Sequence, residues 1–97
     1  MSFSLIYTEA YNRRAAKWLK KHPDLRQQYL KTLQLLELNP FHPSLRLHAL
    51  SGRLAGVHSV SINLSYRITL DLLIEGKEIV LLNLGDQNSG GALRVAV

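Results

Sequence analysis

The spacing of apolar residues changes once along this chain of 97 residues, and that change limits the possible folds more than any single motif. Between about residues 8 and 39, apolar side chains recur at intervals of three and four, the period of an amphipathic helix. Between residues 45 and 84 they mostly alternate with polar side chains, as in strands with one buried face. The sequence therefore predicts helices first and a sheet afterwards.

The first half is predicted to hold a short strand and two helices. Residues 3–7 alternate as a strand, and Thr8 has the side chain that an N-cap requires. The first helix should end near Lys21, and Pro23 suits the first turn of a second helix. Asn39-Pro40 should end that helix, because the residue before a proline avoids helical angles. The two helices would form a hairpin.

The second half is predicted to hold four strands. Alternation begins at Leu45, Val60 and Tyr66, and residues 79–84 form a nearly continuous apolar run. Short connections between successive strands imply antiparallel pairing. The predicted fold class is α+β, in the order β-α-α-β-β-β-β: an antiparallel sheet with an N-terminal helical hairpin packed on one face. Residues 1–97 would form one domain, with residues 86–97 as a loose or altered tail.

Composition narrows the class of protein. The chain has no cysteine, no signal-like start and no apolar run long enough for a membrane, which predicts a cytoplasmic protein without membrane contact. Seven Lys and Arg residues fall between residues 13 and 31, opposed only by Asp24. Such a patch attracts nucleic acid or acidic proteins, although a solvated helix face with no partner explains it equally well.

Generic catalytic signatures are missing. The four histidines have no metal-ligand spacing, and neither a phosphate-binding loop nor a nucleophile elbow is present. We therefore expect no metal and no cofactor. Composition and pattern alone lead to a small basic α+β domain.

Three segments in the second half resemble a known family. Residues 39–52 read Asn-Pro-Phe-His-Pro-Ser-Leu-Arg-Leu-His-Ala-Leu-Ser-Gly, residues 54–62 read Leu-Ala-Gly-Val-His-Ser-Val-Ser-Ile, and residues 66–68 read Tyr-Arg-Ile. In order and spacing they resemble toxins of the RelE/ParE superfamily, especially the YafQ-like and plasmid-stabilisation branch. The resemblance covers residue 3 to about residue 85. It implies the toxin of a type II toxin–antitoxin system.

The resemblance implies metal-free cleavage of mRNA on the ribosome, restrained by an antitoxin protein. Such an endoribonuclease needs a base, a cation on the phosphate and an acid for the leaving oxygen. Arg67 falls on the family position that stabilises the scissile phosphate, His48 on a histidine of YafQ-like toxins, and Gln87 on a position usually held by histidine or arginine. Alternation places Arg67 on the face away from the helices. Arg67 could instead have a structural role, in which it solvates that face or pairs with Asp71. His48 could likewise be an ordinary, half-exposed strand histidine without a catalytic role.

Several positions depart from the family pattern. Ser59 and Ser61 stand where relatives carry cations or a histidine, and the neutral amide of Gln87 cannot transfer a proton. The expected RNA-binding positions are therefore Arg46, Arg53, Ser59 and Ser61, around a reduced catalytic set. A second hypothesis follows, in which a depleted or ParE-like protein binds an antitoxin or gyrase without nuclease activity. A generic RNA-binding domain is the third, weakened by the lack of exposed aromatic pairs on the strands.

Overall fold

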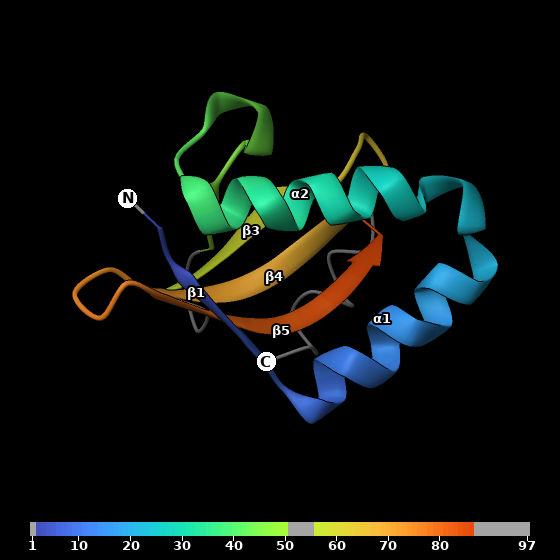
Figure 1. The fold of residues 1–97 in the computed structure, drawn as a ribbon, viewed down its shortest axis with the longest axis horizontal. Helices are drawn as coiled ribbons and strands as arrows, with labels where there is room; N and C mark the ends of the chain where they lie inside the picture. Colours follow the sequence, from blue (N-terminus) through green and yellow to red (C-terminus); the bar gives the residue numbers. More distant parts are fainter. Residues whose placement is uncertain (1, 51–55, 87–97) are drawn as a thin grey trace.

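The computed structural model describes residues 2–50 and 56–86. Figure 1 shows one helix crossing a face of the sheet and the other flanking it. The elements are β1 (Ser4–Tyr7), α1 (Glu9–Lys21), η1 (Pro23–Leu25), α2 (Arg26–Leu38), η2 (Pro43–Leu45), β2 (His48–Ala49), β3 (Val57–Ser61), β4 (Tyr66–Leu73) and β5 (Glu78–Asp86). The α+β class and the helix-then-sheet order are confirmed.

The sheet is mixed, with the strand order β1-β5-β4-β3-β2. The pairs β2–β3, β3–β4 and β4–β5 are antiparallel, whereas β1 and β5 run parallel. The prediction of an entirely antiparallel sheet is therefore corrected at this one pair. Short connections fix the direction of successive strands, but β1 and β5 lie at opposite ends of the described chain, and no short connection constrains them.

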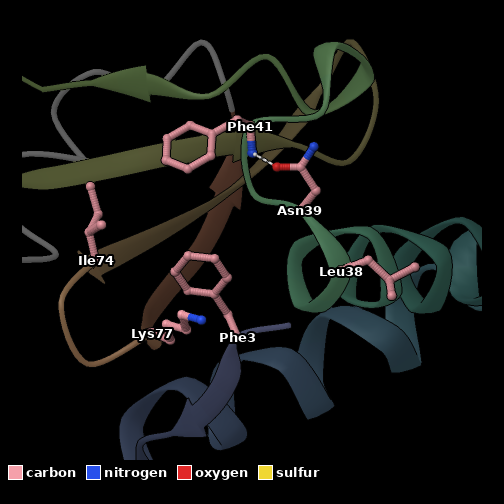
Figure 2. A pocket seen from close by; sticks show the side chains of 6 residues that line it. All are labelled: Phe3, Leu38, Asn39, Phe41, Ile74 and Lys77. Atoms are coloured by element: carbon pink, nitrogen blue, oxygen red, sulfur yellow. Dashed lines mark hydrogen bonds between the residues drawn. The ribbon is translucent and has the colours of Figure 1, made fainter. Parts of the chain in front are cut away.

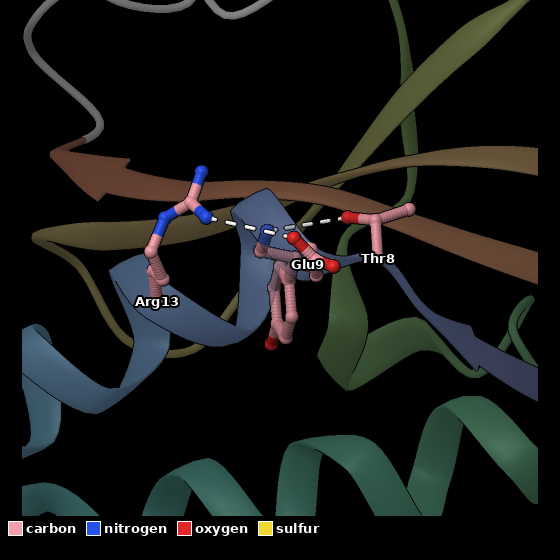
Figure 3. A network of polar contacts seen from close by, with 4 residues as sticks. Thr8, Glu9 and Arg13 are labelled. Carbon is pink, nitrogen blue, oxygen red and sulfur yellow. Dashed lines mark hydrogen bonds and ion pairs between the residues drawn. The ribbon is translucent and has the colours of Figure 1, made fainter.

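Local capping sets where the first helix begins. The side chain of Thr8 accepts a hydrogen bond from the backbone N of Tyr11 at 3.2 Å, and its hydroxyl donates to the carbonyl of Leu81 at 2.8 Å. Thr8 thus caps α1 and fastens the start of the helix to β5. Glu9 in the first turn pairs with Arg13 at 3.7 Å, as Figure 3 shows. Both side chains are largely exposed, so water screens this ion pair and it stabilises the helix little.

The second helix begins and ends close to the predicted positions. Pro23 opens a separate 3₁₀ turn, after which α2 starts at Arg26, and α2 ends at Leu38 before Asn39. Its inward face packs into one core with α1 and the sheet. The largest fully buried members of this core are Tyr11, Leu36, Leu45, Ile68, Leu70, Ile79, Leu81 and Val60.

The strand predicted to start at Leu45 is much shorter than expected. Leu45 closes a 3₁₀ turn, and Arg46 adopts the left-handed conformation with φ 51° and ψ 52°. A strand cannot contain that conformation, so pairing begins only at His48. Alternation over residues 45–49 was a misleading signal because it is too short to distinguish a strand from a turn followed by a bridge.

The predicted tail, residues 86–97, lies outside the residues that the structure describes, apart from Asp86. Over residues 2–50 and 56–86, no helix is long and apolar enough to cross a membrane.

Candidate functional site

The strand register gathers hydrogen-bonding side chains into a line across the sheet. His48 pairs with Ser59, Ser59 with Thr69, and Thr69 with Asn83. Directly paired residues project from the same face of a sheet, so these four side chains form one row, here called the polar row. Their neighbours in sequence, such as Val60 and Leu84, lie in the core with the helices. The polar row therefore lies on the face away from that core.

Most of the polar row is enclosed. Ser59 and Thr69 have no exposed surface and Asn83 is 8% exposed, whereas His48 at the sheet edge is exposed. The Oγ1 of Thr69 is buried and has no hydrogen-bond partner within the described chain. Buried hydroxyls without a partner are uncommon in native proteins because each costs free energy. This face therefore carries a specific polar arrangement that packing alone does not explain.

Arg67 lies directly beside the polar row. It pairs in register with Ser61, and its Nη1 donates a hydrogen bond to the Oγ of Ser59 at 2.6 Å. The side chain is half-buried, and its Nε is enclosed without a hydrogen-bond partner among the described residues. Among the described residues Arg67 forms no ion pair, with Asp71 or with another carboxylate, and the neutral hydroxyl of Ser59 holds its guanidinium.

His48 and Arg67 approach the same serine from two sides. His48 is the register partner of Ser59 on β2, and Arg67 reaches Ser59 diagonally from β4. Side chains at directly paired positions have Cβ atoms about 5 Å apart. The structure thus brings an imidazole and a guanidinium to one small area of the sheet, as the sequence predicts for Arg67 and His48.

The predicted RNA-binding positions separate into three groups. Ser61 and Arg46 line a hollow of about 340 Å³ at the end of β3, where Arg46 is exposed. Ser59 is enclosed and accepts a hydrogen bond from Arg67, so the arginine lies between this serine and the surface. Arg53 and the predicted catalytic Gln87 lie outside the described residues.

Sequence reasoning missed one polar contact at the other end of the row. The Nη1 of Arg14, on α1, donates to the Oδ1 of Asn83 at 2.9 Å. Asn83 is the one polar residue in the run Ile79–Leu84, the nearly continuous apolar run of the sequence. An amide in a buried strand signals a specific hydrogen bond, and this signal pointed to Asn83 although not to its partner.

The histidines other than His48 have local roles. The Nδ1 of His42 caps η2 by accepting from the backbone N of Ser44 at 3.2 Å. His58 contacts the carbonyl of Gly56 at 3.3 Å, and the ring of His22 packs against Trp18 with centroids 5.1 Å apart. In the part of the chain that the structure describes, no three histidine or carboxylate side chains gather as metal ligands would.

An apolar hollow of about 530 Å³ lies between the end of α2 and the turn that joins β4 to β5, as Figure 2 shows. Its lining is Phe3, Leu38, Asn39, Phe41, Ile74 and Lys77. Asn39 accepts a hydrogen bond from the backbone N of Phe41 at 3.0 Å. Lys77 is the one charged residue among these six, so this lining offers no acid–base pair.

Comparison with solved structures identifies the fold. A YoeB/ParE toxin from Agrobacterium tumefaciens superposes with a TM-score of 0.72 at 15% identity, covering 88% of this chain and 99% of that chain. YafQ from E. coli gives 0.68 at 20% identity, covering 94% and 97%. The E. coli DinJ–YafQ toxin–antitoxin complex gives 0.72 at 15% identity, covering 93% and 98%. No family model and no curated protein matches the sequence. The chain therefore has the fold of RelE/ParE-type toxins over nearly its whole length.

Proposed function

We propose that this chain, which has the fold of RelE/ParE-type toxins, is the toxin of a toxin–antitoxin pair and acts by cleaving mRNA on the ribosome. One observation carries the proposal: the guanidinium of Arg67 is held by Ser59 on the sheet face, next to His48, and forms no ion pair among the described residues. A fixed and uncompensated guanidinium suits a phosphate group.

The chemistry requires no metal. The 2′-hydroxyl of RNA loses its proton and attacks the adjacent phosphorus, and the bond to the leaving 5′-oxygen breaks as that oxygen takes up a proton. Arg67 would bind the non-bridging oxygens, where negative charge increases in the transition state. His48 would accept or donate the proton at one of the two oxygens, because an imidazole nitrogen can act as a base or, when protonated, as an acid. The products are a 2′,3′-cyclic phosphate and a free 5′-hydroxyl.

A second function is supported by the side chains that surround Arg67. Ser59 and Ser61 supply hydroxyls in place of cations or a histidine, and His48 is the one general acid or base that the polar row contains. The reaction needs both an acid and a base, and losing one such group costs roughly a hundredfold or more in rate. A protein that keeps the fold and binds an antitoxin or gyrase without cutting RNA is therefore the alternative.

We propose an antitoxin as the partner in either case. One solved neighbour of the same fold is described as a toxin–antitoxin complex, DinJ–YafQ. On this chain the exposed cations of α1, among them Lys17, Lys20 and Lys21, offer an acidic partner a complementary surface. The partner should contain an acidic, amphipathic segment that orders on binding.

Growth arrest on induced expression tests the function. The natural protein is compared with Arg67→Ala and Gln87→His, and ribosome-bound mRNA is mapped for new 5′ ends. The nuclease function is supported if the natural protein arrests growth and cleaves mRNA and if Arg67→Ala abolishes both effects. A soluble, folded protein that neither arrests growth nor cuts mRNA supports the binding alternative, and toxicity gained through Gln87→His would then locate the missing group.

A further inference from the structure

Among the described strands, the second half of β5 is paired on one edge only, with β4, because β1 ends early. Pairing between β1 and β5 stops at Tyr7 and Leu81, and the chain turns directly into α1. The second half of β5 is therefore flanked by α1 (Figure 1). This arrangement lets an α1 side chain reach Asn83 at the end of the polar row, and that side chain is Arg14.

Two arginines thus approach the polar row from different elements. Arg67 donates to Ser59 and Arg14 donates to Asn83, each through Nη1 to a neutral oxygen. Within residues 2–50 and 56–86 neither arginine forms an ion pair; the ion pair present there joins Arg13 to Glu9. A guanidinium has five N–H donors, so both arginines keep donors and full charge for a ligand. Asp71 is the carboxylate on this face of β4, and it pairs with neither.

The register gives the spacing of the two acceptors that hold the arginines. Thr69 on β4 pairs with Ser59 on β3 and with Asn83 on β5. Neighbouring strands lie about 4.8 Å apart, so the two acceptors lie roughly 10 Å apart across the sheet. Thr69 lies between the two, and its buried Oγ1 lacks a partner in the described chain.

We infer that Arg14, held by Asn83, is a second phosphate-binding residue of this face, so that single-stranded RNA contacts Arg67 and Arg14 through two of its phosphates. The inference rests on the proposed function and extends it from one phosphate contact, at Arg67, to a second contact on the same face of the sheet. Arg14 binds substrate in this assignment, and Asn83 positions it.

Arg13 provides a matched control for the charge. It precedes Arg14 on the same helix, is exposed as Arg14 is, and its charge is compensated by Glu9 (Figure 3). Arg13→Ala and Arg14→Ala remove the same side chain and the same formal charge. A nonspecific attraction to net charge would weaken both equally, whereas a specific contact would weaken only the second.

Fluorescence anisotropy with a short, unstructured, labelled oligouridylate measures the effect on the full chain. We expect Arg14→Ala to weaken binding roughly five- to tenfold at low salt, as for loss of one charge-assisted hydrogen bond. The slope of log K against log salt should become shallower by about 0.7, the loss of one phosphate contact on a single strand. Arg13→Ala should stay within about twofold of the natural protein.

Asn83→Asp separates binding from fold stability. This replacement keeps the shape of the side chain and strengthens its bond to Arg14 while neutralising the arginine. We expect the urea midpoint to be unchanged or higher and RNA binding to be weaker than that of Asn12→Asp, which makes the same charge change at an exposed position of α1. A purely structural role for Arg14 predicts instead that Asn83→Asp and Asn12→Asp bind RNA equally.

The remaining outcomes are also decisive. Equal effects of Arg13→Ala and Arg14→Ala, with Arg67→Ala still losing RNA, would overturn the second phosphate contact and leave the proposed function intact. If Arg14→Ala loses binding to the antitoxin but keeps RNA binding, Arg14 belongs to a protein interface and the inference is overturned. If neither Arg67→Ala nor Arg14→Ala affects RNA binding, the proposed RNA site itself is wrong.

Discussion

Ser59 accepts a hydrogen bond of 2.6 Å from Arg67 while having no exposed surface of its own. The serine therefore restricts the direction of the guanidinium, whose Nη groups keep further donors, whereas its Nε is enclosed. The family resemblance led us to expect an RNA contact at Ser59, but the structure places Arg67 between this serine and the surface.

Ser59→Ala should weaken RNA binding because it frees the guanidinium of Arg67 to rotate. The free energy of unfolding should also fall by about 1–2 kcal/mol, as for loss of a hydrogen bond to a charged group. A double-mutant cycle with Arg67→Ala, followed by anisotropy, checks the cause. Once Arg67 is absent, Ser59→Ala should no longer change RNA affinity; a loss of equal size in both backgrounds would contradict the coupling.

His48→Ala tests the proposed proton transfer. If the nuclease operates, cleavage of ribosome-bound mRNA should slow by about a hundredfold or more, while RNA affinity changes little, because the imidazole acts mainly in the transition state. His58→Ala serves as the comparison, since His58 contacts Gly56 and lies away from the polar row. Equal rates for the two folded variants would remove His48 from the reaction.

Thr69→Val should be neutral or stabilising for the fold. The Oγ1 of Thr69 is buried without a partner in the described chain, and valine has the same shape without the hydroxyl. Removing an unsatisfied buried hydroxyl is expected to gain up to about 1 kcal/mol in the free energy of unfolding. Urea denaturation measures this directly. A clear loss of stability would mean that the hydroxyl is hydrogen-bonded in solution.

Arg46→Gly should raise stability and weaken RNA binding together. Arg46 has φ 51°, a left-handed conformation that costs a side chain roughly 1 kcal/mol or more and that glycine adopts freely. The gain is partly offset because glycine also makes the unfolded chain more flexible. Arg46→Ala keeps the strain and loses the charge, so it should weaken RNA binding without any rise in the urea midpoint. If Arg46→Gly binds RNA as the natural protein does, Arg46 is not an RNA contact.

Stability should fall at alkaline pH because of a buried tyrosine pair. The hydroxyls of Tyr11 and Tyr29 lie 2.6 Å apart, and burial raises the pKa of Tyr11 far above its ordinary value of 10.0 and also raises the pKa of Tyr29. In the unfolded chain both tyrosines ionise near the ordinary value. Their contribution to stability is therefore complete below about pH 10 and is lost progressively as the pH rises above it.

Urea denaturation measures this loss. The midpoints of the natural protein and of Tyr11→Phe are compared from neutral pH to about pH 11. Tyr11→Phe should be less stable at neutral pH by about 1 kcal/mol, because Tyr29 loses its buried partner. It should also lose less stability as the pH rises, because one ionising group has been removed. Parallel pH profiles for the two proteins would show that another group governs the alkaline loss.

The sequence by itself determined those features that depend on neighbours along the chain. Thr8 caps α1 through a backbone amide three residues away, and Asn39-Pro40 ends α2 through local steric hindrance. Alternation likewise places Arg67 on the face away from the core, because the period of a strand is two. These are short-range effects, and the corresponding predictions about helices and faces hold.

Only the tertiary structure decided the contacts between distant segments. The parallel pairing of β1 with β5, the enclosure of Ser59 and the bond from Arg14 to Asn83 join residues that no connection or periodicity relates. Such contacts depend on which surfaces bury the most apolar area together, and that is a property of the whole packed chain. For this reason the sequence pointed to Arg67 and His48, whereas the second arginine became visible only once α1 was packed beside β5.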